Sequence, residues 1–400
     1  MKLNCRYFIR LSYAVLVTMS FLIMLFLIMP TFQLFVTDEP KPIHPAVLRC
    51  LECPIEKGHY AYFAVVEEAD FSNLPILIDP AVLSCLDCPL QQNQTVHFAN
   101  AGQAELPFGF NVVIHTIHAD SSKDFFVFEH KDERRAVRRF LTQVTDFKGY
   151  KVRIPENPKK FIWEWNRGRL LACLNITMKR PSQEREIPLS FVDEMADLRN
   201  LFIAHNVTPL LAGGTLLGWY RECSLIPHTT DVDFAILEEE HSNVLNAYLK
   251  KSQKFWFLWE LGKLDDCYEF SLFRKARKID VFYLYSLSTP PHYCSYHFYR
   301  NQIIHYEIST YLKDKICAAD LLGQLMYVPC NTEEYLEAEY GTGWREDHQS
   351  ESWSYVDNPK NIVELKQLSE SAFNSRINYV NKEAQVMSAK DCDCAVNSIA

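Results

Sequence analysis

Two aspartates separated by one residue are the clearest candidates for chemistry in this 400-residue chain. Asp231 and Asp233 lie in the run His-Thr-Thr-Asp-Val-Asp-Phe-Ala-Ile at 228–236. The alternating apolar residues predict a β-strand, in which alternate residues point to the same face. The two carboxylates should therefore project together and repel each other unless a cation lies between them. Mg²⁺ and Mn²⁺ fit that arrangement, because these ions bridge carboxylates to substrate phosphates.

A third carboxylate is available further along the chain. Asp280 is the single acid in the strongly apolar run 278–284, which also predicts a strand. An ionised carboxylate is costly to bury without a partner. On a strand next to that of Asp231 and Asp233, Asp280 would complete a three-carboxylate metal cluster. Asp-x-Asp pairs are also common in loops and calcium sites, so the pair alone does not establish catalysis.

A glycine turn precedes the aspartates. The apolar run 209–212 leads into Gly213, Gly214 and Thr215, where a helical segment begins. Glycines after a strand let the backbone approach a phosphate, and a helix N-terminus offers N–H groups and a positive dipole end. The order of a glycine turn, an Asp-x-Asp strand and a later strand with one Asp predicts a nucleotidyltransferase fold.

The elements around these motifs predict an α/β (α+β) protein with a mixed sheet in its catalytic domain. Upstream, 110–114, 125–128 and 161–165 read as strands, and 131–145 reads as an amphipathic helix. A second amphipathic helix is expected at 189–204, directly before the glycine turn. No chemistry is evident in the upstream region. His115 and His118 there are expected to be structural or surface residues.

The N-terminus carries an uncharged, mostly apolar run from residue 11 to 37, with Lys2, Arg6 and Arg10 before it. About 20 apolar residues span a bilayer, and basic residues stay on the cytoplasmic side. We expect a signal anchor rather than a cleaved signal peptide, whose apolar region is shorter. The predicted organisation is a cytoplasmic tail (1–10), a transmembrane anchor (11–36), a lumenal stem with a small α/β domain (37–185) and a catalytic domain (186–390).

Cysteine usage and charge agree with a secretory-pathway protein. Of thirteen cysteines, Cys5 falls in the predicted tail and twelve on the lumenal side. A repeat at 45–54 and 80–89 predicts a short helix ending in Cys-x-x-Cys. In an oxidising lumen such pairs favour disulfides; zinc binding and redox chemistry are the alternatives. The net charge of −9 argues against nucleic-acid binding.

The motif region resembles the fukutin/LicD family of nucleotidyltransferase-fold phosphotransferases. The segment Gly-Thr-Leu-Leu-Gly-Trp-Tyr-Arg-Glu-Cys-Ser-Leu-Ile-Pro-His-Thr-Thr-Asp-Val-Asp at 214–233 carries the resemblance. It continues through 262–266 and 278–282 and resumes at 328–344, so that residues 190–365 are covered strongly.

This resemblance implies a Golgi or ER transferase, single-pass and type II, that moves a phospho-alditol such as ribitol 5-phosphate from a CDP-linked donor to a glycoprotein glycan hydroxyl. Asp231, Asp233 and Asp280 would be catalytic and hold the metal, with the proton acceptor among them left open. The donor-binding candidates are Gly213, Gly214, Thr215, Gly218, Arg221 and Lys263. For Arg221, an exposed structural salt bridge is an equal alternative.

Two other functions remain open at this point. One is transfer of phosphocholine or another group from a CDP-linked donor. The other is a non-catalytic Golgi scaffold for a partner glycosyltransferase, although the presence of all three aspartates argues against a silent protein. Cys317 and Cys330 are expected to form a disulfide, and Trp344 is expected in the core rather than stacked on a base.

Overall fold

The computed structural model describes residues 74–91, 94–100, 111–180, 185–288, 291–297, 300–307, 316–348 and 358–381. All of these belong to one unit, Ser72–Ala400. The predicted tail, the anchor at 11–36 and the first Cys-x-x-Cys copy lie outside the described residues. Among the helices that are described, none has both the length and the apolar character needed to cross a bilayer.

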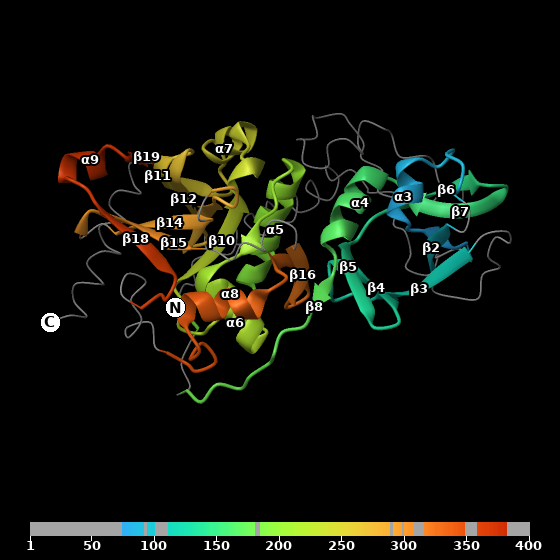
Figure 1. Cartoon of the computed structure of the whole chain (residues 1–400), viewed down its shortest axis with the longest axis horizontal. Coiled ribbons are helices and arrows are strands. Elements are labelled where there is room, and N and C mark those ends of the chain that lie inside the picture. Colours follow the sequence, from blue (N-terminus) through green and yellow to red (C-terminus); the bar gives the residue numbers. More distant parts are fainter. Residues whose placement is uncertain are drawn as a thin grey trace, which may run out of the picture. The chain divides into compact units, whose positions relative to one another are not determined.

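The described residues form a mixed α/β fold, as predicted, and its first part is a seven-stranded sheet (Figure 1). The strands are β1 (Ile76–Leu77), β2 (Thr95–Asn100), β3 (Asn111–Ala119), β4 (Phe125–His130), β5 (Glu133–Arg138), β6 (Thr142–Phe147) and β7 (Tyr150–Pro155). Their order is β5-β4-β3-β2-β1-β7-β6. The strands predicted at 110–114 and 125–128 correspond to β3 and β4.

The helix predicted at 131–145 is wrong, because this segment forms β5, a turn and β6. The paired arginines and the apolar i, i+3, i+4 spacing of this segment predict a helix, but contacts with distant residues decide which of its side chains are buried. Arg138 is buried and its guanidinium donates to the Glu164 carboxylate at 2.6 Å. A buried arginine with such a partner cannot be distinguished by sequence period from an exposed one on a helix.

The strand predicted at 161–165 is also wrong, because these residues lie in helix α4 (Pro158–Arg167). The Asn157 side chain caps this helix by accepting the Lys160 N–H at 3.0 Å, and Pro158 opens its first turn. Asn at the cap with Pro at the first position is a helix start signal that outranks a short apolar run. Phe161 and Trp165 stack one turn apart on the buried face.

The upstream region also holds the second copy of the cysteine repeat and the two histidines. Helix α3 (Pro80–Ser84) ends in a Cys85–Cys88 disulfide, as the repeat predicted. His115 is buried, and burial together with His97 lowers its pKa to about 4. His118 pairs with Glu129 near the surface. Both histidines are therefore structural or surface residues, as expected.

The larger part of the fold is a nine-stranded mixed sheet. Its strands are β8 (Leu170–Leu171), β9 (Leu210–Leu211), β10 (Asp231–Leu237), β11 (Trp256–Lys263), β12 (Asp266–Arg274), β13 (Arg277–Leu284), β16 (Ile316–Leu321), β17 (Gln324–Pro329) and β19 (Ile377–Tyr379). The order is β19-β11-β12-β13-β10-β9-β17-β16-β8. At its centre β10 runs parallel to β13 and antiparallel to β9.

Helices flank this sheet (Figure 1). The helices are α5 (Phe191–Ala204), α6 (Gly213–Glu222), η1 (Glu238–Glu240), α7 (Asn243–Leu249), α8 (Thr332–Tyr340) and α9 (Glu370–Asn374). Helix α5 confirms the helix predicted at 189–204. Helix α6 packs on β10, and α5 and α8 pack on β17.

A separate three-stranded sheet adjoins the β12 and β13 side of the large sheet. It consists of β14 (His292–His297), β15 (Gln302–Glu307) and β18 (Ile362–Gln367), in the order β14-β15-β18. Strand β14 contacts both β12 and β13. Apolar residues of β11, β14 and β15, with Phe373 of α9, form a small core of their own.

The main core crosses the predicted domain boundary at 185/186. Phe125, Val127 and Ala136 of the upstream sheet share one buried cluster with α5, α6 and β10. Arg199 of α5 is buried and binds the Asp124 carboxylate at 2.7 Å. The boundary stays a prediction. The two regions share buried apolar side chains, so separating them would expose apolar surface on both and neither is expected to be stable independently of the other.

All eight cysteines among the described residues form disulfides. The predicted Cys317–Cys330 pair is confirmed and joins β16 to the loop before α8. Cys173–Cys223 ties the segment after β8 to the end of α6. Cys267–Cys294 links β12 to β14.

Candidate active site

The three predicted aspartates meet on two central strands of the large sheet. Strands β10 and β13 are parallel, and their register places Asp233 beside Asp280. Each of Asp231, Asp233 and Asp280 offers an oxygen within 4.8 Å of the others. Asp280 is further held by the hydroxyl of Ser271 on β12, which donates to its carboxylate. The prediction that Asp280 lies on a neighbouring strand is confirmed.

Lys278 also belongs to this cluster and is not among the residues predicted from the sequence. Lys278 lies opposite Asp231 in the strand register, with its Nζ 3.0 Å from Asp280 Oδ2 and 3.8 Å from Asp231 Oδ2. A signal was present in the sequence: Lys278 and Asp280 are two residues apart on a strand and must share a face. In the described chain, this ammonium group supplies positive charge to the carboxylates.

The electrostatics of the cluster follow from burial and crowding. Burial raises the pKa of Asp233 well above its usual value, and the neighbouring carboxylates of Asp231 and Asp280 raise it further. Burial alone would lower the pKa of Lys278, but the aspartates outweigh that effect and raise it. Three carboxylates and one ammonium leave excess negative charge, which attracts further positive charge to this site.

The ligand set suits a hard divalent cation. All three side chains offer carboxylate oxygens, the ligands that Mg²⁺ and Mn²⁺ prefer, and no sulfur or imidazole belongs to the group. Burial and two neighbouring carboxylates raise the pKa of Asp233, and a bound cation relieves such crowding of negative charge. The residues present therefore fit such an ion.

The glycine turn packs directly against these carboxylates. Gly213 has a φ of +47°, and a Cβ built on it would lie 2.8 Å from Asp233 Oδ2. A side chain is therefore excluded by both backbone conformation and space. Gly214 is open, with Thr229 Oγ1 as the nearest atom at 3.9 Å. Thr215 is buried, and its Oγ1 accepts the backbone N–H of Asp233 at 2.8 Å.

This turn also begins helix α6, so that the first backbone N–H groups of a ten-residue helix lie beside the carboxylate cluster. Helix N-termini stabilise anions. The structure thus brings Gly213, Gly214 and Thr215 together with the aspartates, as the sequence predicted.

Two other donor-binding candidates have structural surroundings instead. A Cβ on Gly218 would lie 2.8 Å from the Ser224 carbonyl oxygen and 3.0 Å from Ile226, so this glycine permits close packing within the fold. Arg221 is buried and donates to the Glu222 carboxylate and to the Glu346 carbonyl. The structural salt bridge anticipated for Arg221 is present, although it is buried rather than exposed.

Lys263 is the last residue of β11 and lies away from the aspartates along the strand direction. It pairs with Asp266 at the β11–β12 turn, whereas the β12 residue beside Asp280 is Ser271, five positions further along. At about 3.3 Å per residue this is roughly 16 Å along the strand. The structure therefore does not bring Lys263 to the aspartates, and the positive charge expected from it is supplied by Lys278.

Two buried glutamates near the cluster were also missed. Glu269 lies on the same face of β12 as Ser271, and burial followed by the charge of Asp280 raises its pKa. Glu339 of α8 is buried, which raises its pKa to about 7, and its charge contributes to the raised pKa of Asp233. Tyr293 donates to Glu339 Oε1 at 3.3 Å, while the buried Oε2 has no hydrogen-bond partner in the part of the chain that the structure describes.

Trp344, the remaining aromatic residue of the motif region, is fully buried, as the core interpretation expected. The Trp344 ring contacts Tyr220 in the last turn of α6, and the Arg345 guanidinium lies over the Trp344 ring. It therefore does not present a stacking surface for a base.

Comparison with known proteins adds to this geometry. The family described as LicD/FKTN/FKRP, nucleotidyltransferase domain, matches residues 206–331, a range that contains the glycine turn and all three aspartates. An uncharacterized protein of Caenorhabditis elegans, T07A5.1, is 32% identical over 265 residues, which are 62% of this chain and 69% of the relative. The chain belongs to the LicD/FKTN/FKRP family.

Other relatives match over shorter shares of their length. A second uncharacterized nematode protein, W02B3.4, is 30% identical over 261 residues, 63% of this chain and 66% of the relative. Human FKTN, named a ribitol-5-phosphate transferase, is 28% identical over 247 residues, 56% of this chain. The match spans about half of FKTN, 49% of its length.

Proposed function

We propose that this protein is a metal-dependent transferase that moves a phospho-alditol group, of the ribitol 5-phosphate kind, from a CDP-linked donor to a hydroxyl of a glycoprotein glycan. The observation that carries this proposal is the convergence of Asp231, Asp233 and Asp280 beside the α6 N-terminus. FKTN, a related protein, is named for transfer of ribitol 5-phosphate.

In this proposal the three aspartates hold Mg²⁺ or Mn²⁺, which when bound would neutralise charge on the donor pyrophosphate. The N–H groups at the start of α6 bind the same phosphates, and Gly213 allows their close approach. Lys278 balances the carboxylates in the metal-free chain and, once a cation takes that place, contributes a donor for phosphate. The cation that the aspartates would hold, the N–H groups of α6 and the Lys278 ammonium would together stabilise the negative charge that builds up as the nucleotide leaves.

Glu339 is a further candidate, beside the aspartates, for the group that accepts the proton of the acceptor hydroxyl. A general base works best with a pKa near the working pH, and burial gives Glu339 a pKa of about 7. Its buried Oε2 has no hydrogen-bond partner among the described residues. A cation that the aspartates bind would withdraw their charge.

We further propose that the protein is a single-pass Golgi or ER membrane protein with its catalytic domain in the lumen, alone or with partner glycosyltransferases. The apolar run at 11–36 supports an anchor. The disulfides that join every described cysteine support an oxidising compartment.

The test uses the purified full-length chain in detergent. Melting temperatures would be measured with Mn²⁺ and, in turn, CDP-ribitol, CDP-glycerol and CDP-choline, because a ligand that binds only the native state raises the melting temperature. We expect metal-dependent stabilisation by CDP-ribitol that is lost in Asp233→Asn. A response to CDP-choline alone would favour phosphocholine transfer. If no CDP compound binds and Asp233→Asn still supports glycan modification in cells, the protein is a scaffold.

A further inference from the structure

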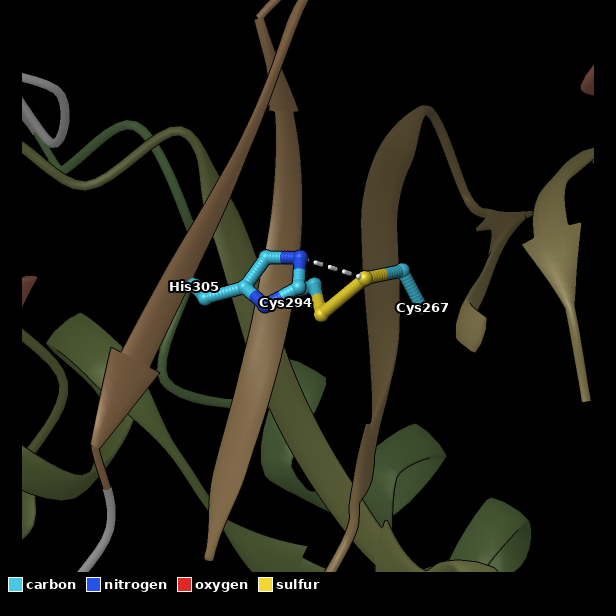
Figure 2. Close-up of side chains that lie close together, drawn as sticks. All are labelled: Cys267, Cys294 and His305. Carbon is cyan, nitrogen blue, oxygen red and sulfur yellow. Dashed lines mark hydrogen bonds between the residues drawn. A yellow bond between two sulfur atoms is a disulfide. The ribbon is translucent and has the colours of Figure 1, made fainter. Parts of the chain in front are cut away.

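A second cluster of potential metal ligands lies away from the aspartates, between β12 and the three-stranded sheet. Cys267 of β12 and Cys294 of β14 form a disulfide, and His305 of β15 lies against it (Figure 2). The Nε2 atom of His305 is 3.2 Å from the Cys267 sulfur. One atom from each of the three residues lies within 4.8 Å of the others.

The strand register explains why these side chains meet. Cys294 is directly opposite His305, and His305 is directly opposite Glu364 of β18. Directly opposed residues of antiparallel strands share a face and have neighbouring Cβ atoms. The three side chains therefore form one row across the sheet, with its cysteine end facing Cys267.

The position of Cys267 depends on an irregularity in the pairing of β11 with β12, where β12 carries an extra residue. The β11–β12 register shifts between Leu261 and Lys263, so that Gly262 faces the bulged part of β12. A Cβ on Gly262 would lie 1.9 Å from the Cys267 carbonyl oxygen, and Gly262 has a φ of +75°. Bulges of this kind redirect side chains next to functional sites. Here the bulge turns Cys267 toward Cys294.

The histidine is arranged as metal-binding histidines are. Its Nε2 faces the sulfurs, while its Nδ1 lies 3.4 Å from the Glu364 carboxylate. Metal-ligating histidines usually donate their other ring N–H to a carboxylate, which fixes the ring orientation. A structural disulfide has no need of such an oriented imidazole. The other disulfides of the described residues belong to no such ligand group.

We propose that Cys267, Cys294 and His305 form a zinc site in the reduced protein, for which the disulfide is the oxidised, metal-free form. Two thiolates and one imidazole are ligands that Zn²⁺ prefers, and a water would complete four-coordination. Zinc–nitrogen and zinc–sulfur bonds of about 2.0 and 2.3 Å place the two ligand atoms about 3.5 Å apart. The observed separation of 3.2 Å is close to this value.

Conversion between the two forms balances chemically. A dithiol reduces the Cys267–Cys294 bond by exchange, giving two thiols and the oxidised dithiol. Zn²⁺ then binds the two sulfurs and His305, and two protons are released. In the reverse direction a disulfide oxidant accepts two electrons from the thiolates, takes up two protons as it becomes two thiols, and Zn²⁺ leaves. The Cα atoms of the cysteines are 5.1 Å apart, so side-chain rotation can separate the sulfurs.

The test uses the full-length chain, reduced anaerobically with a phosphine and titrated with Co²⁺ alone as the probe. Thiolate-to-cobalt charge-transfer absorption reports sulfur ligation, which the aspartate cluster cannot produce. We expect this absorption in the reduced protein and none from this pair in the oxidised protein. Glu364→Gln should weaken Co²⁺ binding at this pair about 10–100-fold, as loss of a carboxylate that orients a ligating histidine does.

His305→Gln keeps both cysteines, so the oxidised chain can still fold, and it should weaken Co²⁺ binding more than Glu364→Gln. The double variant Cys317→Ser with Cys330→Ser removes an equal number of thiols elsewhere and should leave the signal of the first pair unchanged. The proposal is overturned if His305→Gln binds Co²⁺ as tightly as the parent. It is equally overturned if the Cys267–Cys294 bond can be reduced only when the protein unfolds.

Discussion

Lys278 occupies the place where the proposed cation would exert its charge, and this gives a quantitative prediction. Its Nζ lies 3.0 Å from Asp280 Oδ2 and 3.8 Å from Asp231 Oδ2. The lysine side chain is 32% exposed and that of Asp280 is 11% exposed. Exposed ion pairs contribute about 0.2–1 kcal/mol, while breaking a buried pair costs about 3–5 kcal/mol. For this half-buried group we expect Lys278→Met to cost about 2 kcal/mol in EDTA.

A cation bound by the same carboxylates should abolish most of that cost. In saturating Mn²⁺ we expect the free energy of unfolding of Lys278→Met to lie within about 0.5 kcal/mol of the parent, the range of ordinary surface substitutions. By linkage, the variant should then bind Mn²⁺ more tightly by about 2 kcal/mol, roughly 30-fold. The transferase rate should nevertheless fall, because a phosphate donor is lost.

The assay is urea unfolding of parent and variant in EDTA and in Mn²⁺, together with a direct Mn²⁺ titration. Lys263→Met is the matched control, since Lys263 lies in the same sheet about 16 Å along the strand direction and should leave both quantities unchanged. If Lys278→Met loses as much stability in Mn²⁺ as in EDTA, or binds Mn²⁺ no more tightly, then Lys278 and the metal do not share these carboxylates and the reasoning fails.

Three further predictions concern the surroundings of the aspartates. Gly213→Ala should lose about 1–2 kcal/mol of stability through its left-handed backbone and weaken Mn²⁺ binding by displacing Asp233, whereas Gly214→Ala, with open space and a helical position, should be neutral or slightly stabilising in unfolding experiments. Asp233→Asn should raise the melting temperature in EDTA near neutral pH, because it removes a carboxylate whose pKa burial raises; a lower melting temperature would contradict this. Glu339 has a folded pKa of about 7 against an ordinary 4.5, so the native state binds more protons than the unfolded state and the metal-free stability should fall as pH rises from about 4.5 to 7. Glu339→Gln should reduce that fall by about 2–3 kcal/mol. An unchanged pH profile would show that Glu339 is not buried as described.

The part of the site that could be predicted from sequence is the part encoded by strand period. Asp231 and Asp233 share a face because they are two residues apart, and Asp280 stands out as the single acid in an apolar run. The same period applies to Lys278, so its place in the cluster was available from sequence as well. The glycine turn was readable because a helix follows it directly.

The remaining features depend on which strands pair and in which register. Lys263 lies in 262–266, one of the segments that resemble the family, yet it is placed at the β11–β12 turn, away from the aspartates. Glu339 acts on Asp233 electrostatically because its helix α8 packs on β17 of the same sheet. Neither placement has a local signature in the sequence. The register of the β11–β12 hairpin sets the position of Lys263. Packing between segments that are more than 50 residues apart in the sequence sets the position of Glu339.

The misread segments show the same limit in the upstream region. Arg138 and Glu164 are 26 residues apart and satisfy each other in the interior. Considered alone, Arg138 and Glu164 are each typical of a charged residue exposed to solvent. The sequence of 131–145 therefore predicts an amphipathic helix, and nothing near Glu164 predicts the burial of its side chain in α4. Only Asn157 with Pro158 carried a local signal for that helix, and it was outweighed by the apolar run that followed.

The two clusters differ in a way that decides what each can bind. The aspartate site combines oxygen ligands, a helix N-terminus and a lysine, so it is suited to a hard cation together with phosphate. The Cys267–Cys294–His305 cluster has sulfur and nitrogen ligands, with its cysteines buried and only the Glu364 end of its row well exposed. Because Mg²⁺ binds thiolates poorly and Zn²⁺ binds them strongly, the two sites should not compete for one metal. Loss of the thiolate site should therefore leave Mn²⁺ binding at Asp231 and Asp233 intact, which separates the two proposals experimentally.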